Sequence, residues 1–135
     1  MKEQLLTTLE NSRNYTMAVA DAMPDKHYSF KPVDTVWSFG ELLQHIAYGI
    51  HWWEENFIKG NKVEWAPPAV SAKKKQVAES LTSSYDALVK TVSKGNLSEE
   101  AVKGFHATID HITHHRGQAV LFLRLQGVVP PEYIY

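Results

Sequence analysis

The chain has 135 residues, of which 44% are hydrophobic and 21% charged, with a formal net charge of −1. This balance is typical of one globular domain with a buried core, and its near-neutral charge argues against nucleic acid or an anionic membrane as partners. The absence of cysteine excludes disulfides and thiolate ligands within the chain. We expect a single domain over residues 1–135 in a cytoplasmic protein, because no segment resembles a signal peptide or approaches the roughly 20 apolar residues of a membrane span.

Helical periodicity predicts the first two elements. Apolar residues step by three and four positions over Leu5–Met23, and Pro24 ends this helix. Ser38 and Glu41 have the spacing of a capping box, in which the serine and glutamate side chains bond each other's backbone amides. The second helix is therefore expected to run from Ser38 to about Lys59.

The third and fourth helices follow in the same way. Valine and leucine at helical spacing predict a helix over residues 71–93. Ser98, followed by two glutamates, is a typical helix start, and the fourth helix is expected to continue to about Gln126. Because glycine weakens helices, Gly104 is expected to separate a short leading turn from a main helix that begins near Phe105.

These four helices, with weak strand signals throughout, predict an all-α four-helix bundle. The connections before and after the second helix are long, so simple up-down-up-down wiring is not assured. Five large aromatic residues are expected to belong chiefly to the core: Trp37, Trp52, Trp53, Phe57 and Trp65. Trp52 shares a helix face with His45, which suggests that it could also wall a site there.

Four of the seven histidines lie between residues 106 and 115 of the fourth helix. His111 and His115 are one turn apart and separated by about 40° around the helix, so their imidazoles can converge on one ion. His114 lies about 60° to the other side of His111, which makes a three-residue pairing geometrically feasible as well. An isolated H-x-x-x-H spacing is common by chance and is weak evidence alone.

His45 is the third histidine that makes a metal site with His111 and His115 a specific hypothesis. It lies on an apolar face of the second helix, where a lone histidine is more often a hydrogen-bonded core residue. Together with His111 and His115 it completes a three-histidine set with an open position, as in catalytic zinc-type sites, where the cation lowers the pKa of a bound water. A buried hydrogen-bonded network of histidines without metal is the alternative.

Other polar residues near the motif have open roles. Arg116 is expected to form an ion pair or an inter-helix hydrogen bond, and Gly117 to permit the close approach of a neighbouring helix. Gln118 could hydrogen-bond a metal ligand or a bound water, or cap polar groups in the core. His114 has no assigned role. The remaining histidines are expected to lie outside the site: His27, His51 and His106.

Three segments, "ELLQHIA", "DHITHHRGQ" and "LRLQGVVPPEY", together resemble the DinB-like (YfiT-like) metalloenzymes. The resemblance implies a four-helix bundle with one long crossover connection, often a homodimer. It also implies a divalent metal held by His45, His111 and His115, with His114 and Arg116 at positions that are not ligands. Some members add a low-molecular-weight thiol, such as bacillithiol or mycothiol, to an electrophile, and one branch isomerises maleylpyruvate.

We therefore expect a metal-dependent enzyme that adds an external thiol to a small electrophile, with hydrolysis as the next reaction class. The alternative is a non-catalytic, metal-stabilised dimer that acts as a stress or interaction protein. Its motivation is the small chain and the aromatic tail, Tyr133–Tyr135, which must pack on the bundle or on another subunit. Zinc or nickel is expected first, then iron or manganese, because imidazole ligands suit several of these metals.

Overall fold

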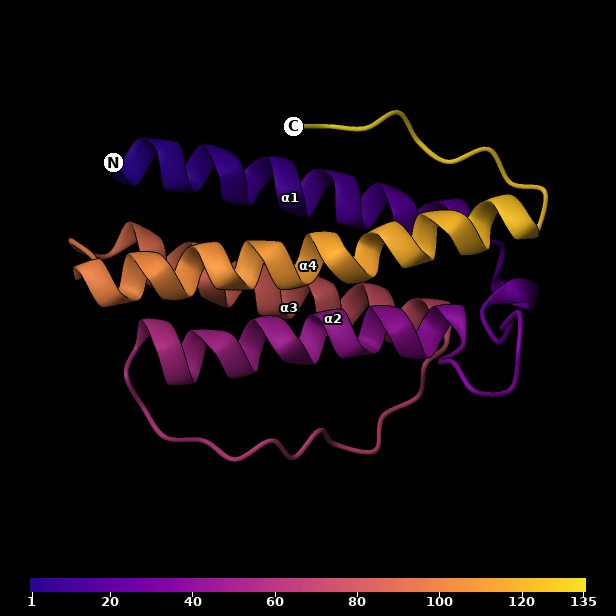
Figure 1. Cartoon of the computed structure of the whole chain (residues 1–135), viewed down its shortest axis with the longest axis horizontal. Coiled ribbons are helices and arrows are strands. Elements are labelled where there is room, and N and C mark those ends of the chain that lie inside the picture. Colours follow the sequence, from indigo (N-terminus) through magenta and orange to yellow (C-terminus); the bar gives the residue numbers. More distant parts are fainter.

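The computed structural model describes residues 1–135 and contains four α-helices and no strand, which confirms the predicted all-α class. The helices lie alongside one another as a bundle (Figure 1). Their bounds are α1 Lys2–Ala22, α2 Phe39–Trp53, α3 Lys74–Ser93 and α4 Glu99–Leu125. A short 3₁₀ turn, η1 (Asp25–His27), follows α1, and a π-helical turn, η2 (Glu54–Ile58), extends α2.

The helices α2 and α3 run parallel, so the chain does not have up-down-up-down wiring. Ser84 Oγ donates to the carbonyl of Ala47, and further along both helices Thr91 Oγ1 donates to the Glu54 carboxylate. Residue numbers thus increase in the same direction along the pair. The connection over residues 59–73 must return the length of the bundle, and it arches outside α2 (Figure 1). This is the long crossover that the resemblance implied.

Both predicted helix caps are present. Ser38 Oγ accepts from the Glu41 amide at 3.2 Å while Glu41 Oε1 accepts from the Ser38 amide at 3.0 Å. Ser98 Oγ accepts from the Ala101 amide at 3.1 Å at the start of α4. These bonds satisfy amides that have no partner within the helix. The third helix begins at Lys74 rather than Ser71, and the Ser71 carbonyl, still in the crossover, accepts from the Gln44 side chain.

The expectation that Gly104 interrupts the fourth helix is wrong. Helix α4 is continuous from Glu99 to Leu125. A Cβ atom at position 104 would lie 2.4 Å from the carbonyl oxygen of Phe57. The glycine therefore lets the backbone of η2 approach α4 closely. The helix continues through Gly104 because its backbone hydrogen bonds do not depend on a side chain.

The core is a single cluster of 25 buried apolar residues, including Phe39, Phe105 and Tyr85. The prediction that the five large aromatics belong to it is wrong. Trp37, Phe57 and Trp65 are 46%, 46% and 45% exposed, and Trp52 and Trp53 are only partly buried. They lie on α2, on η2 and in the connections before and after them.

Arg116 ties α4 to α1 from the side opposite the other motif residues. It is buried, and its Nη1 donates to the Ser12 carbonyl at 3.3 Å and to Thr16 Oγ1 at 3.2 Å. Its guanidinium lies 4.8 Å from the ring centroid of Tyr15 and 5.8 Å from that of Tyr133. The predicted inter-helix hydrogen bond is confirmed, and it forms without a carboxylate partner.

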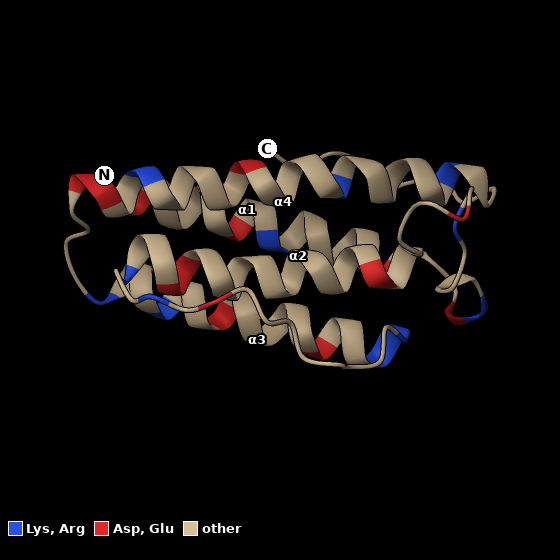
Figure 2. Cartoon of the chain, turned by 60° about the horizontal axis from the view of Figure 1, so that its bottom comes forward, with Lys and Arg blue, Asp and Glu red and all other residues tan.

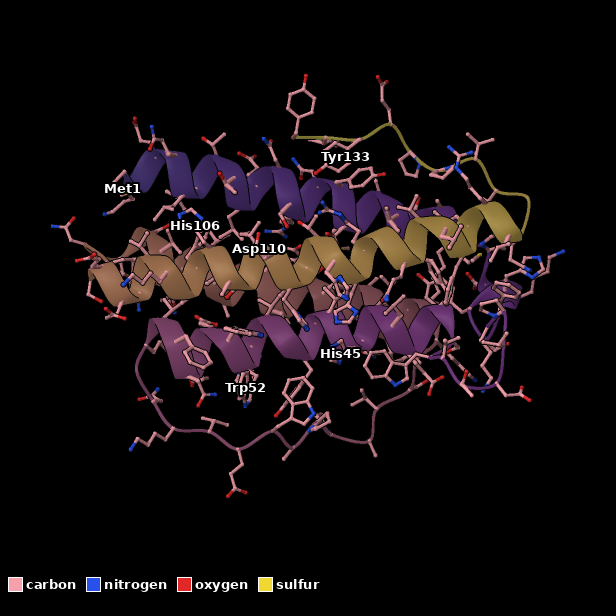
Figure 3. The ribbon with its side chains drawn as sticks, in the orientation of Figure 1. Met1, His45, Trp52, His106, Asp110 and Tyr133 are labelled. Carbon is pink, nitrogen blue, oxygen red and sulfur yellow. The ribbon has the colours of Figure 1, made fainter.

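The C-terminal tail folds back onto the bundle beside α1 (Figures 1 and 3). Tyr15 donates its hydroxyl hydrogen to the Pro131 carbonyl at 3.2 Å, and its ring meets that of Tyr133 edge-on at 5.1 Å. Tyr135 is 95% exposed. One ring of the aromatic tail thus contacts its own chain, although Tyr133 stays 54% exposed.

The expected role of Gly117 is also wrong, because no atom lies within 4 Å of where its Cβ would be. It is exposed on the outer face of α4.

Acidic and basic residues are interspersed on the face drawn in Figure 2. None of the helices combines the length and apolar character needed to cross a membrane.

Candidate metal centre

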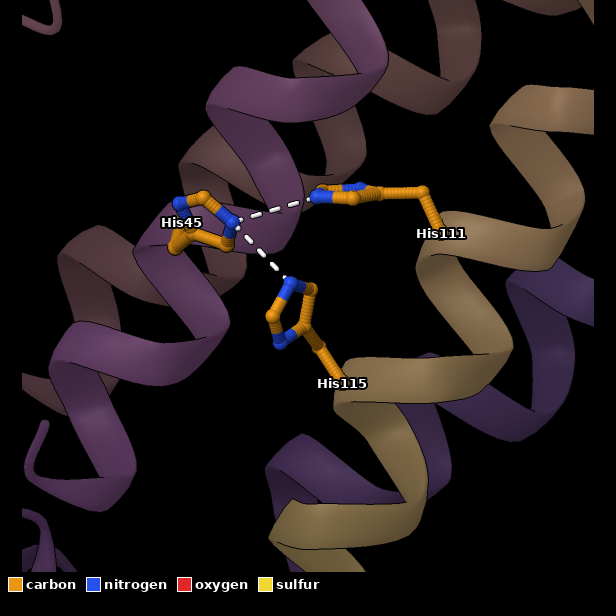
Figure 4. A group of neighbouring side chains, drawn as sticks. All are labelled: His45, His111 and His115. Carbon is orange, nitrogen blue, oxygen red and sulfur yellow. Dashed lines mark hydrogen bonds between the residues drawn. The ribbon is translucent and has the colours of Figure 1, made fainter. Parts of the chain in front are cut away.

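Helices α2 and α4 bring together the three histidines singled out in the sequence. Nε2 of His45 lies 3.1 Å from Nε2 of His111 and 3.1 Å from Nε2 of His115 (Figure 4). One ring nitrogen of each lies within 4.8 Å of the others, and all three side chains are partly buried. The cluster could hold a metal ion, and its role as a ligand set stays a prediction.

The nitrogen spacing fits a bound cation. A tetrahedral ion with bonds of about 2.0–2.1 Å to nitrogen holds its ligand atoms about 3.3 Å apart. The two distances from His45 Nε2 are 3.1 Å, so small side-chain adjustments would open the cluster to that spacing. Three imidazoles leave a coordination position free, which is the arrangement of catalytic rather than structural zinc-type sites.

Hydrogen bonding alone does not satisfy the three rings. Gln118 Oε1 can only accept, so His115 Nδ1 at 2.9 Å carries a hydrogen and its Nε2 presents a lone pair. His45 Nε2 faces both other rings but carries at most one hydrogen. His111 Nδ1 is buried without any partner. A cation that accepts three lone pairs suits this arrangement better than a metal-free network does.

Two of the rings are poised to be neutral. Burial, and then the charge that His115 would carry, lower the pKa of His45 to about 4. Burial is also the main cause for His111, whose pKa falls to about 4 with smaller contributions from His115, His45 and His114. Both rings are therefore neutral near neutral pH, with one ring nitrogen free to bind a metal.

Gly49 makes room for the His111 ring. A Cβ atom at this position on α2 would lie 2.6 Å from Cε1 and 3.0 Å from Nδ1 of His111. Any larger residue would push the imidazole out of its place. The sequence offered one signal of this role, a glycine one turn after His45 inside a well-formed helix.

Indole rings from the connections, rather than Trp52, flank the cluster. The ring centroid of Trp37 lies 4.3 Å from that of His45, and that of Trp65 lies 5.4 Å away. The expectation that Trp52 walls the site is wrong, because it lies two helical turns beyond His45, about 10 Å along the axis. Its Nε1 instead donates to the Val63 carbonyl in the crossover. Figure 3 shows Trp52 on the side of α2 that faces the crossover.

His27, His51 and His106 lie outside the cluster, as predicted, and so does His114, whose role the sequence left open. His114 is exposed and makes no polar contact, although its ring centroid lies 4.8 Å from that of His115. His106 is exposed on α4 and His27 lies in η1. His51 is exposed on α2 and lines the cavity beside His45 without joining the cluster.

A cavity of about 1130 Å³ adjoins the cluster at His45. It lies between α2, α3 and the crossover, and neither His111 nor His115 lines it. His45 is thus the member of the cluster that the cavity reaches. A small molecule in this space would lie directly beside one member of the cluster.

The sequence profile of the DinB family matches residues 1–103. The chain belongs to the DinB family. The matched region contains His45, whereas His111 and His115 lie beyond its end. The uncharacterized protein YjoA of Bacillus subtilis (strain 168) is 24% identical over 142 residues, which span 92% of this chain and 90% of that protein.

Solved structures support the DinB fold. A DinB-like protein from Bacillus cereus ATCC 10987 superposes with a TM-score of 0.77 at 19% identity, over 98% of this chain and 97% of the other. The DinB-like protein YjoA from B. subtilis gives a TM-score of 0.75 at 21% identity, over 97% and 98%. At these identities the likeness establishes the DinB four-helix architecture.

Proposed function

We propose that this DinB protein binds one divalent cation through Nε2 of His45, His111 and His115 and acts as an enzyme on a small molecule. The observation that carries the proposal is the convergence of three ring nitrogens from two helices at spacings close to those around a tetrahedral ion. Zinc or nickel is proposed first, then iron or manganese. The cavity beside His45 favours an enzyme over a closed structural site.

When bound, a cation with three imidazole ligands keeps a position at which it lowers the pKa of a water or an external thiol. The chain's own residues prepare the site for this. Gln118 fixes the tautomer of His115 so that Nε2 is free, and Gly49 leaves space for His111. Trp37 covers one face of His45 and limits the access of water from that side.

The proposed reaction is the addition of a low-molecular-weight thiol to an electrophile. The chain has no cysteine, so the thiol must come from outside. The S–H bond breaks as the sulfur forms a bond to the electrophilic carbon. In a substitution the bond from that carbon to the leaving group breaks and the leaving group takes the proton; in an addition the double bond opens and its other atom takes the proton. We place this reaction in the cytoplasm, where small thiols are kept reduced. Hydrolysis by water is the second reaction class.

Elemental analysis of protein purified without chelators tests the metal part. We expect one divalent ion per chain in the wild type and almost none in His45→Ala. The matched control is His51→Ala, which removes an exposed imidazole from the same helix and should keep the ion. A wild type that neither contains nor takes up Zn, Ni, Fe or Mn would refute the proposal. A loaded protein that is inactive on a panel of thiols and electrophiles would refute only the transferase.

A non-catalytic, metal-stabilised homodimer that serves in stress or interaction is the second candidate. The observation in its favour is exposed apolar surface, with Leu121 and Leu125 at 56% and 53% exposure and Tyr135 at 95%. Light scattering on the wild type and on a chain without Tyr133–Tyr135 tests it. This candidate predicts a dimer that the truncation converts to a monomer. A monomeric wild type would exclude it.

A further inference from the structure

The crossover covers the cavity beside His45 and is hydrogen-bonded to α2 on both sides of it. Near its start the crossover bonds to α2 through Trp52 Nε1, which donates to the Val63 carbonyl at 3.0 Å, and through the Ala66 amide, which donates to Tyr48 Oη at 2.9 Å. At its end the Gln44 side chain donates to the Ser71 carbonyl at 2.8 Å. Residues 67–70 make no hydrogen bond to the helices between these ties. The cavity is therefore preformed rather than an accident of a loose loop.

Its walls are aromatic and incompletely buried. Trp37 and Trp65 line the cavity and are 46% and 45% exposed, and Tyr48 lines it as well. Neither of the two exposed indoles uses its N–H in a hydrogen bond within the chain. Large aromatic rings that stay half in water lose much of the free energy that burial would provide. A ligand with an apolar or aromatic body would cover them.

Its floor combines small polar side chains with acidic ones. Ser80, Ser83 and Ser84 line it from α3, and only Ser84 is committed, donating to the Ala47 carbonyl at 2.7 Å. The charged lining residues are all acidic, and there is no lysine or arginine among them: Glu41, Glu64 and Glu79. The backbone N–H of Ser38 holds the pKa of Glu41 below its ordinary value, so this carboxylate is ionised at neutral pH.

We propose that this cavity binds a small organic cation, with an apolar or aromatic body against Trp37 and Trp65 and an ammonium group toward Glu41 and Glu79. Aromatic faces and carboxylates both attract positive charge, and no lysine or arginine lines the cavity to pair with an anionic ligand; its basic side chains are the imidazoles of His45 and His51. The inference rests on the proposed function for turnover, since it names the substrate class of the same site. Binding itself does not require the metal.

A charge series of similar shape tests this on the metal-stripped, ¹⁵N-labelled chain: benzylamine, benzyl alcohol and benzoate. We expect benzylamine to shift the indole N–H signals of Trp37 and Trp65 but not that of Trp53, which does not line the cavity. Single Trp→Phe variants assign the signals. Benzylamine should bind at least about threefold more tightly than benzyl alcohol, and benzoate most weakly. Equal or tighter binding of benzoate, or no shift at Trp37 and Trp65, would overturn the proposal.

Charge-removing variants locate the ammonium group. Glu41→Gln and Glu79→Gln should each weaken benzylamine binding about threefold, the size of an exposed ion pair. Glutamine at position 41 keeps the capping box, so the start of α2 stays formed. Glu10→Gln on the exposed face of α1 makes the same change in net charge and should leave binding unchanged. An equal loss in Glu10→Gln, or no loss in either cavity variant, would refute the placement.

The same samples separate this proposal from the metal proposal. Benzylamine binding without any uptake of zinc would refute only the metal site. Zinc uptake by a chain that ignores benzylamine would refute only the substrate class.

Discussion

Substitution of Gly49 by alanine tests whether the His111 ring must occupy its observed place. The added Cβ would lie 2.6 Å from Cε1 of His111, whereas carbon atoms in contact are separated by about 3.5 Å or more. The ring must therefore retreat by about 1 Å. Metal–ligand distances tolerate only about 0.2 Å, so His111 would leave the coordination sphere or bind in a strained position. We expect zinc affinity to fall by 10-fold to 100-fold or more, the range for disturbed ligand support.

The fold should survive this change. Alanine is about 1 kcal/mol more favourable than glycine inside a helix, which offsets part of the cost of the contact. The assay is a zinc titration of metal-stripped protein against a competing chelator, together with thermal unfolding of the metal-free chain. A Gly49→Ala variant that folds and binds zinc as tightly as the wild type would show that metal binding does not need the space Gly49 leaves for His111.

Two other helical glycines serve as matched controls. Gly117 has no atom within 4 Å of its Cβ position, so Gly117→Ala should raise the unfolding midpoint by about 4 °C and leave zinc affinity unchanged. In Gly104→Ala the Cβ would meet the Phe57 carbonyl at 2.4 Å, which should destabilise the chain through the contact of η2 with α4. Loss of zinc affinity in Gly117→Ala would show that the effect is not specific to His111.

Three further predictions concern the support of the site. Gln118→Leu removes the acceptor for His115 Nδ1 and should lower zinc affinity about 10-fold in a chelator competition. Stability should change little because Gln118 is exposed, and unchanged zinc affinity would contradict its role in orienting His115. Because the folded-state pKa values of His45 and His111 lie at about 4, the unfolded chain binds more protons between about pH 6.5 and 4. The metal-free protein should therefore lose stability as the pH falls through this range in urea unfolding, and a flat profile would contradict the burial of these rings. Arg116→Met removes hydrogen bonds to Ser12 and Thr16 and should cost about 1–3 kcal/mol in urea unfolding without changing zinc affinity, whereas a loss of affinity would give Arg116 a role at the site.

The sequence was sufficient for features that depend on neighbours along the chain. Ser38 and Ser98 cap their helices where predicted, because capping uses amides only three residues away. His111 and His115 share a face because helix geometry places residues four apart one above the other. The partnership with His45 needed its apolar helix face and the family resemblance, since no spacing rule links residues on different helices.

Features that depend on contacts across the fold were not accessible in this way. The sequence suggested that Gly104 interrupts the helix and that Gly117 admits a neighbouring helix, yet it is Gly104 that meets the backbone at Phe57, and Gly117 meets nothing. Trp37 and Trp65 lie in connections whose course has no periodic signal, so their approach to His45 could not be predicted. Trp52 was expected beside His45 because the two residues share a helix face, but it lies two turns away along the helix.

Anomalous diffraction from zinc-soaked crystals would locate the cation that we propose between the three histidines. We expect one strong peak per chain, about 2.0–2.1 Å from Nε2 of His45, His111 and His115. No peak between these rings, or zinc bound only at other side chains, would contradict the proposal.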